Sequence, residues 1–372
     1  MAGDEQSTIA TPPVDRRAPT EAGCTYDGGK VTCEDLETAD VTDGVLFRIE
    51  GLEVYFPIHE SFFKALVSTE KKWVKAVDKI SFEVKQGEIL ALVGESGCGK
   101  TTTGRTMLRL EEPTGGHILY KGLPVELFSQ RTLRDYRKKA QIIFQDPYNS
   151  INPKQTIFDI VAEPLEVNSL VTSEREKEER VVKAINEAGL RPAHEYLYRY
   201  PHELSGGQRQ RVCIAGATVL EPDVIVADEP VASLDVSIRN DILKLMVEQK
   251  DKLGVTYIFI THDLSLAWVI SDRIAVMYLG RIVEIGDTEE VVSNPKHPYT
   301  KALISVIPVP DPVAKREHVI LSGETPNPVD IPTGCRFHPR CPEAIDACSE
   351  VEPTDVHIEG DHDHYAACIR LT

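Results

Sequence analysis

A glycine-rich loop that ends in lysine and threonine carries the clearest chemistry of this sequence. Residues 94–101 read GESGCGKT, which matches the pattern G-x-x-x-x-G-K-[ST] of loops that wrap backbone N–H groups around phosphates. The loop follows a strand-like run and precedes a helical stretch, whose N-terminus adds unpaired N–H groups and a positive dipole end. We expect Lys100 to reach the β- and γ-phosphates of a nucleotide and the Thr101 hydroxyl to ligate Mg²⁺.

Two adjacent acids, Asp228 and Glu229, directly follow the apolar run 224–227. A buried strand that ends in two carboxylates is costly unless a cation or a reaction partner offsets their charge. Asp228 is placed to hold Mg²⁺ through water, and Glu229 is placed to polarise an attacking water as a general base. The alternative for this pair alone is a strand end with two solvated acids.

Four short apolar runs are the elements that must position these groups. They are rich in β-branched residues, as are strands that are buried on both faces of a mostly parallel sheet. The runs and the residues at which they end are 89–93 with Gly94, 141–144 with Gln145, 224–227 with Asp228, and 255–261 with His262. In open α/β sheets, ligands bind at the carboxyl ends of the strands. The pattern therefore predicts an α/β fold with one common site at this edge.

The remaining sequence suggests three regions. Residues 1–44 carry ten acids and three bases without an apolar period, so we expect an acidic, disordered N-terminal extension. Residues 45–293 form the predicted main domain, which begins with short antiparallel strands and contains a helical insert at about 146–215. A proline-rich, less regular extension then covers 294–372.

Composition and charge exclude several classes of protein. The chain has 41% hydrophobic and 27% charged residues, and because it has no run of about 18 apolar residues we expect no membrane span. The N-terminus lacks the apolar core of a secretion signal. A net charge of −18 argues against a protein that mainly grips nucleic acid, because such proteins present a basic face to phosphates.

The segment 204–211, LSGGQRQR, closely resembles the signature of ABC-family ATPases. The other family motifs occur in the family order: Gln145 as the glutamine loop, 232–235 as the D-loop and His262 as the switch histidine. The resemblance covers roughly 45–290. It implies an ABC-type nucleotide-binding domain with a RecA-like P-loop core, an antiparallel β subdomain and a helical subdomain.

The resemblance also implies roles for individual residues. The expected ATP-binding residues are Phe56, Gly94, Glu95, Ser96, Gly97, Cys98, Gly99, Lys100, Thr101 and Thr102. Mg²⁺ is assigned to Thr101, Gln145 and Asp228, and hydrolysis to Glu229, His262 and Gln145. Phe56 is the expected adenine platform, with Tyr55 as its competitor, although an aromatic residue after a strand is more often part of a core.

The signature residues form a second anion cradle, because a hydroxyl and backbone N–H groups gather at a helix start. They are Leu204, Ser205, Gly206, Gly207 and Gln208. In an ABC fold this cradle lies too far from Lys100 of the same subunit to touch the same γ-phosphate. The family solution is a head-to-tail pair of ATPases, with Asp235 at the interface, so we expect a second ATPase subunit, either another copy or a paralogue.

The C-terminal extension resembles the tails of ATPases that serve oligopeptide, dipeptide and nickel importers. Residues 294–303 and 334–342 carry this resemblance. It implies a peripheral ATPase at the cytoplasmic face of the membrane, two permease subunits and an extracytoplasmic peptide-binding protein. Import of nickel or another small solute is the alternative, and a non-transport ABC ATPase is a further one.

Four cysteines of the extension, Cys335, Cys341, Cys348 and Cys368, are spaced C-x5-C-x6-C-x19-C. In a chain without an export signal, such a cluster more often holds a metal than disulfides. The resemblance implies a 4Fe–4S cluster, and four thiolates suit it. Zinc is the alternative, with four thiolates or mixed ligands from His338, His357, His362 and His364, and an extension without metal is the third possibility.

Overall fold

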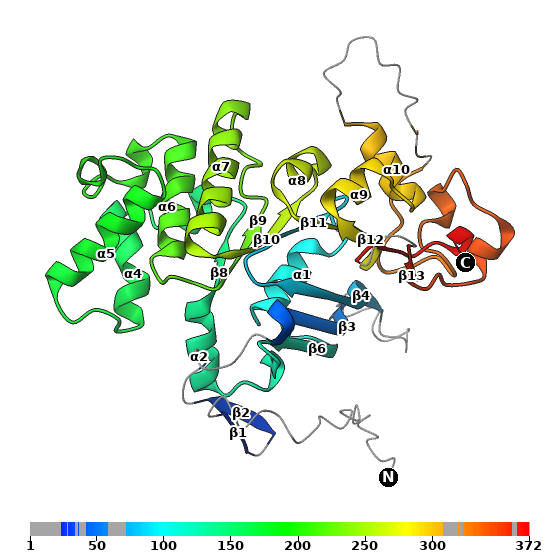
Figure 1. Ribbon diagram of the computed structural model, residues 1–372, viewed down its shortest axis with the longest axis horizontal. Coiled ribbons are helices and arrows are strands. Elements are labelled where there is room, and N and C mark those ends of the chain that lie inside the picture. The colour runs from blue at the N-terminus through cyan, green and yellow to red at the C-terminus, as the bar shows by residue number, and fades with distance from the viewer. Residues whose placement is uncertain are drawn as a thin grey trace, which may run out of the picture.

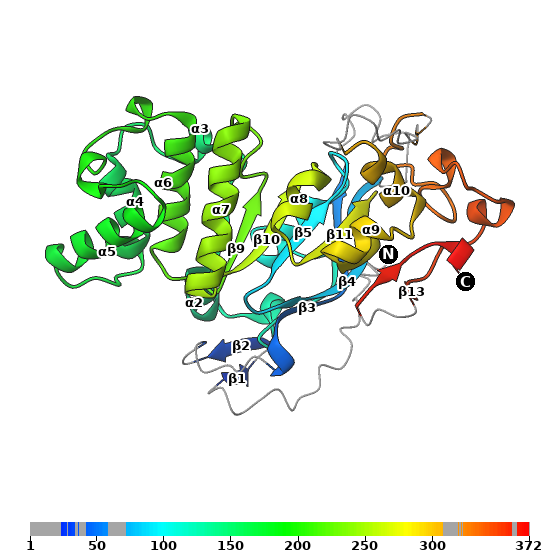
Figure 2. The same ribbon diagram turned by 45° about the horizontal axis from the view of Figure 1, so that its top comes forward.

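The protein is built on one large sheet, with helices around it and a smaller antiparallel sheet beside it (Figure 1). The computed structural model describes residues 24–27, 29–33, 36, 42–58, 72–307, 319, 321, 323–358 and 363–371. Figure 2 shows the helices α4, α5 and α6 at one end of the molecule and the C-terminal tail at the other, with the sheets between them.

The large sheet has eight strands in the order β13-β14-β12-β11-β5-β10-β9-β8. Their bounds are β5 Ile89–Val93, β8 Ala140–Ile143, β9 Val224–Asp228, β10 Thr256–Thr261, β11 Arg273–Tyr278, β12 Arg281–Asp287, β13 Val356–His357 and β14 Tyr365–Ala366. The five strands from β11 to β8 run parallel to their neighbours. Every residue of β5, β9, β10 and β11 is buried, as in a parallel sheet that is covered on both faces. The predicted parallel sheet is confirmed.

The smaller sheet is antiparallel and has the order β4-β3-β6-β7. Its strands are β3 Val45–Pro57, β4 Trp73–Lys85, β6 Gly115–Tyr120 and β7 Leu123–Pro124. Inward-facing residues such as Phe47 and Ile49 pack in one hydrophobic core with Leu90 and Leu92 of β5. This is the predicted antiparallel β subdomain.

Helices line the large sheet and form the helical subdomain. The helices near the sheet are α1 Lys100–Met107, α2 Gln130–Lys139, α7 Val236–Leu253, α8 Leu264–Ile270, α9 Thr288–Ser293 and α10 Pro298–Ser305. The helical subdomain contains α3 Pro147–Ser150, α4 Ile157–Val167, α5 Glu174–Glu187 and α6 Gly206–Thr218. The side chains of Thr156, Ser173 and Ser205 cap α4, α5 and α6, which satisfies N–H groups that a helix start leaves free. In the described part of the chain, no helix is both long and apolar enough to cross a bilayer.

The acidic N-terminal region contains a short hairpin, which corrects the expectation of disorder throughout 1–44. The strands β1 Cys24–Asp27 and β2 Lys30–Cys33 pair antiparallel and are joined by a disulfide between Cys24 and Cys33. Val31 and Cys33 are buried in the core of the smaller sheet, and the Ser129 N–H donates to the Val31 carbonyl at 2.8 Å. The many acidic residues of this region made the alternation of buried Val31 and Cys33 in β2 hard to recognise in the sequence. Residues 1–23 lie outside the described residues, and disorder there stays a prediction.

The C-terminal tail is attached to the large sheet. Its strands β14 and β13 extend the sheet beyond β12 by antiparallel pairing, with Glu284 opposite Ala366. The other described parts of the tail are α10 Pro298–Ser305, loops and short 3-10 turns, among them η7 His338–Arg340 and η8 Asp346–Ser349. The predicted extension therefore exists, and it shares the sheet of the main domain.

Candidate active site

The ends of four parallel strands bring the predicted functional groups to one edge of the sheet. The strands β5, β10, β9 and β8 are neighbours in that order and run in the same direction. Gly94 follows β5, Gln145 follows β8, and His262 follows β10. Asp228 is the last residue of β9, and Glu229 comes next.

The phosphate loop between β5 and α1 is held in a shape that only glycine allows at two positions. Gly99 has φ +108°, and a Cβ there would lie 2.2 Å from the carbonyl oxygen of Ala76. A Cβ on Gly94 would lie 2.2 Å from the carbonyl oxygen of Met277. The loop therefore lies directly against β4 and β11, with no room for side chains at these two residues.

Lys100 provides a cation inside this loop. Its Nζ donates to the carbonyl oxygens of Gly94 at 2.7 Å and Glu95 at 3.0 Å, and only 5% of the residue is exposed. Within the described part of the chain, no acid forms an ion pair with this ammonium group. A buried cation without a countercharge favours an anionic ligand, so the loop fits the phosphates of ATP.

Thr101 and Asp228 supply adjacent oxygen atoms below the loop. The Thr101 hydroxyl donates to Asp228 Oδ1 at 2.9 Å. Burial raises the pKa of Asp228, and the charge of Glu229 adds to this, while the Thr101 hydrogen bond and Arg105 oppose it. A buried carboxylate beside a hydroxyl is a donor set of the kind that Mg²⁺ takes, so these residues fit the predicted metal.

Glu229 is the centre of the predicted catalytic group. Gln145 Nε2 donates to Glu229 Oε2 at 3.0 Å, and His262 Nδ1 lies 3.1 Å from Glu229 Oε1. The backbone of Glu229 is left-handed, with φ 46°, and its N–H donates to Ile260 of β10 at 2.9 Å. Such a conformation is unfavourable for a residue with a Cβ, and here it turns the carboxylate toward Gln145 and His262.

The signature residues lie at the start of α6, in the helical subdomain. Ser205 is exposed and caps the helix: its Oγ accepts from the Gln208 N–H at 3.3 Å, and Gln208 Oε1 accepts from the Ser205 N–H at 2.9 Å. Leu204 is buried beneath them. No hydrogen bond or ion pair between described residues joins 204–208 to the phosphate loop. Asp235 is exposed at the start of α7 and makes no cap with its side chain.

Phe56 and Tyr55 stand at the end of β3, opposite Val74 and Lys75 of β4. The Tyr55 hydroxyl donates to Asp78 Oδ1 at 2.5 Å, and burial together with this bond raises the pKa of Tyr55. Phe56 makes no such bond and is 36% exposed. Its ring therefore has a free surface at the edge of the sheet, and its role as the adenine platform stays a prediction.

Residues of the tail that the sequence analysis did not assign also contact the phosphate loop. Arg340 and Thr325 bind the Glu95 carboxylate, and the Glu95 N–H donates to the Tyr299 hydroxyl at 3.0 Å. More than 200 residues separate these partners in the chain. The only sequence signal for the contact was that the segments 294–303 and 334–342, which contain Tyr299 and Arg340, resemble the tails of importer ATPases.

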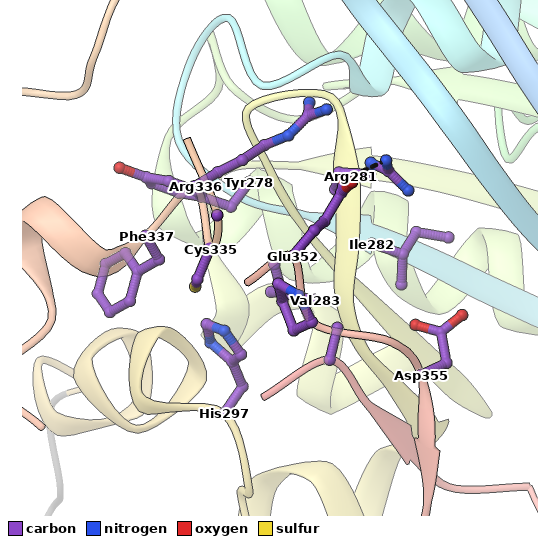
Figure 3. Close-up of a pocket in the computed structure, with 13 residues that line it drawn as sticks. Tyr278, Arg281, Ile282, Val283, His297, Cys335, Arg336, Phe337, Glu352 and Asp355 are labelled. Carbon is purple, nitrogen blue, oxygen red and sulfur yellow. Dashed lines mark hydrogen bonds and ion pairs between the residues drawn. The ribbon is translucent and has the colours of Figure 1, made fainter. Parts of the chain in front are cut away.

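A small cavity marks the joint between the tail and the large sheet. Tyr278 of β11 and Val283 of β12 line it from the sheet, His297 from the loop before α10, and Cys335 and Phe337 from the tail (Figure 3). Figure 3 shows Cys335, Phe337 and His297 together at this joint, and the ring centroids of His297 and Phe337 lie 5.6 Å apart.

The four tail cysteines gather without forming a metal site. Burial raises the pKa of Cys335 to about 11, and the nearby thiols of Cys348, Cys368 and Cys341 add to this. Across the described ranges, however, no group of three or more His, Cys, Asp or Glu residues is placed to hold a metal ion. The predicted 4Fe–4S or zinc site is therefore not supported.

The histidines that were considered as mixed zinc ligands are engaged elsewhere. His338 Nδ1 lies 2.9 Å from the Cys335 carbonyl oxygen, and His364 Nε2 lies 2.9 Å from Oε1 of the buried Glu284. The His357 ring packs edge-on against Tyr365. His362 lies outside the described residues.

Comparisons with known proteins agree with this geometry. The family model described as ABC transporter matches residues 77–232, and that for the C-terminal region of oligopeptide/dipeptide transporters matches 283–348. The dipeptide transport ATP-binding protein DppF of Haemophilus influenzae is 47% identical over 85% of this chain and 94% of its own length. The oligopeptide transport ATP-binding protein AppF of Bacillus subtilis is 46% identical over 87% of this chain and 96% of its own length.

A solved structure shares the fold. The ABC transporter component cbiO1 of Clostridium perfringens is 29% identical, with a TM-score of 0.57 over 68% of this chain and 92% of its own. Because DppF and AppF are 47% and 46% identical over most of this chain and nearly their whole length, the chain belongs to the ABC transporter family, as one of its ATP-binding subunits.

Proposed function

We propose that this chain hydrolyses ATP to drive the import of dipeptides or oligopeptides through a pair of permease subunits. The observation that carries the proposal is the position of Glu229, which Gln145 and His262 hold at the strand edge, next to Asp228 and its partner Thr101. The similarity to DppF, a dipeptide transport ATP-binding protein, and to AppF, an oligopeptide transport ATP-binding protein, supports the peptide cargo.

The site residues divide the chemistry between binding and hydrolysis. Lys100 moves from the carbonyl groups of the loop to the β- and γ-phosphates, while the loop N–H groups bind the remaining phosphate oxygens. Thr101 and Asp228 hold Mg²⁺, which neutralises charge on the phosphates when it is bound. Glu229 orients the attacking water and accepts its proton, and Gln145 and His262 keep the carboxylate aimed.

The signature of a second ATPase subunit completes the site. In this chain Ser205 is exposed at the start of a helix, as a cradle for the phosphate of a partner must be. The partner is a second copy of this chain or a paralogue. In either case each ATP lies between Lys100 of one subunit and Ser205 of the other.

A groove beside Gln145 is suited to a permease. It has a volume of about 500 Å³ and lies between β8, α4 and α6, where Phe144, Val167 and Cys213 contribute to its lining. Phe144 is 41% and Val167 75% exposed, and exposed apolar side chains at a groove favour a helix of a partner protein. In the proposed assembly the chain is peripheral to the membrane at its cytoplasmic face, and an extracytoplasmic binding protein delivers the cargo.

Uptake by the assembled transporter tests the proposal. Cells that lack this chain are expected to lose ATP-dependent uptake of a labelled dipeptide and to regain it with the wild-type gene. They should not regain it with a Lys100→Ala variant. Uptake of nickel in place of peptide would favour the alternative cargo, and copurification with ribosomes or DNA in place of permeases would overturn the transport role.

The metal content of the tail is a separate question. A 4Fe–4S cluster bound by Cys335, Cys341, Cys348 and Cys368 rests on family resemblance alone, and zinc is its alternative. Protein purified without oxygen should be brown and contain iron if the cluster is present. Colourless protein with one zinc per chain would support zinc, and protein without either metal would exclude both.

A further inference from the structure

The tail reaches the phosphate loop through an arginine. Arg340, at the end of η7, donates from Nη1 to Glu95 Oε2 at 2.8 Å and from Nη2 to Glu95 Oε1 at 3.0 Å. This fork is a two-bond arrangement that an arginine makes with a carboxylate and a lysine does not. The Arg340 side chain is only 9% exposed and that of Glu95 30%.

Glu95 is the second residue of the phosphate loop, and its carboxylate, N–H and carbonyl oxygen all form hydrogen bonds. Thr325 of the tail donates its hydroxyl to the same carboxylate, and the Glu95 N–H donates to the Tyr299 hydroxyl at 3.0 Å. The Glu95 carbonyl oxygen accepts from Lys100 Nζ at 3.0 Å. A continuous set of hydrogen bonds therefore runs from the tail to the lysine that meets the phosphates.

The charges make this contact important for a phosphate ligand. Burial alone would raise the pKa of Glu95, but the bonds from Arg340 and Thr325 and the charge of Lys100 hold it below its usual range, so the side chain is a carboxylate. A carboxylate beside the loop would repel a triphosphate. The Arg340 guanidinium offsets that charge within the same contact.

Aromatic rings are packed closely around Arg340. Nη1 of Arg340 lies 3.5 Å from the Tyr278 hydroxyl, and the rings of Tyr278, Tyr299 and Phe337 lie with their centroids 4.8 to 5.3 Å apart. A second tail arginine, Arg336, donates to the Leu279 carbonyl and to Asp78 of β4 (Figure 3 shows Arg336 beside Tyr278). The tail is thus fixed to the strands on both sides of the phosphate loop.

We propose that Arg340 is a positioning residue for ATP binding, which neutralises Glu95, keeps the loop 94–101 in its phosphate-receiving shape and couples the C-terminal tail to nucleotide affinity. The inference rests on the proposed placement of ATP at this loop. Arg340 acts through Glu95 and touches neither the phosphates nor the attacking water.

A double-mutant cycle on the full-length chain tests the inference. Arg340→Met should raise the KM and the Kd for MgATP about tenfold, because it leaves the Glu95 charge uncompensated. The kcat at saturating ATP should stay within about twofold, because binding is weakened and Glu229, Gln145 and His262 are unchanged. In a Glu95→Gln background, Arg340→Met should change the Kd by less than about twofold.

Two further variants separate positioning from folding. Arg340→Lys keeps the positive charge but cannot form the two-bond contact, so its Kd for MgATP should lie between those of wild type and Arg340→Met. This variant also tests the inference if Arg340→Met does not fold. Arg370→Met removes an exposed tail arginine that pairs with Glu343 at 2.8 Å, and it should leave the Kd unchanged. Equal losses of affinity in the wild-type and Glu95→Gln backgrounds, or the same Kd for Arg340→Lys and wild type, would overturn the inference.

The Lys100→Ala variant separates a failure of the role of Arg340 from a failure of the proposed ATP placement at the loop 94–101. If Lys100→Ala binds MgATP normally, the placement of ATP at the loop is wrong. If Lys100→Ala loses binding while Arg340→Met and Arg340→Lys do not, the placement stands and only the role of Arg340 fails.

Discussion

At the scale of single residues, the site depends on side chains whose neighbours prepare them for one task. Glu229 accepts from Gln145 and lies beside His262, and its left-handed backbone aims it at both. Lys100 is buried among carbonyl groups that phosphates can replace. These local arrangements predict separate effects on catalysis and on binding.

Substitution of Glu229 by glutamine should abolish turnover and keep ATP binding. The amide fills the same space but cannot accept the proton of the attacking water, so we expect kcat to fall by about 10²- to 10⁴-fold. Phosphate release and the affinity for a fluorescent ATP analogue are the two measurements. Glu221→Gln is the matched control, because Glu221 forms an exposed pair with Lys183. Full hydrolysis by Glu229→Gln would refute its role as the base.

Gly99→Ala should weaken ATP binding. The added Cβ would meet the Ala76 carbonyl oxygen at 2.2 Å in a left-handed backbone, so the loop must shift, and we expect the Kd for ATP to rise by about 10- to 100-fold. Gly87 also has a positive φ, but a Cβ there would meet nothing within 4 Å. Gly87→Ala should therefore lower stability by about 1 kcal/mol without changing the Kd. A normal Kd for Gly99→Ala would show that the loop adapts.

At the scale of elements, helix starts and strand ends form the two halves of the proposed ATP site. The parallel strands β5, β10, β9 and β8 collect the hydrolytic groups of one subunit. The start of α6 presents Ser205 away from that edge, without a bond to it among the described residues. The same hydroxyl caps its own helix, so its structural and functional roles need a control that separates them.

Ser205→Ala should reduce ATP turnover by more than the loss of the helix cap alone would. Loss of the cap costs about 1 kcal/mol of stability, and loss of the hydroxyl also removes a ligand for the partner's phosphate. Ser173 caps α5 through the same kind of bond, its Oγ accepting from the Glu176 N–H at 3.2 Å. Thermal unfolding should shift alike for Ser205→Ala and Ser173→Ala, and only Ser205→Ala should lower ATP turnover. Equal turnover in the two variants would leave Ser205 as a cap alone.

At the scale of the whole molecule, function requires surfaces that this chain exposes. Ser205 of the signature and Asp235 are exposed at the starts of α6 and α7, and the groove at Phe144 lies between β8, α4 and α6. At the other end, the tail extends the large sheet and binds Glu95. The nucleotide site thus lies between the helical subdomain and the tail.

The isolated chain should hydrolyse ATP in a concentration-dependent way. In the proposed paired site each ATP needs a signature from a second subunit, so turnover per chain should rise with protein concentration until dimers form. Initial rates over a dilution series, with light scattering to report the mass, provide the measurement. Rapid turnover that stays constant with dilution, by a chain that scattering shows to be a monomer, would contradict the paired site.

The sequence by itself determined the parts of this protein whose physics is local. A loop such as 94–101 needs glycines and a lysine in fixed order, and a strand buried on both faces needs a short apolar run that ends at the site. The helical subdomain, the antiparallel sheet and the convergence of Gln145, Asp228 and His262 on one edge could therefore be predicted.

Only the tertiary structure decided which distant residues meet. The hairpin of β1 and β2 is stable because Val31 and Cys33 are buried against the smaller sheet, a contact that an acidic composition conceals. The four cysteines of the tail cluster in the sequence, which predicted a metal site. In the described structure, however, no group of three or more His, Cys, Asp or Glu residues is placed to hold a metal ion. Arg340 and Glu95 are 245 residues apart, and no local pattern encodes their pairing, because it depends on where the tail folds back across the sheet.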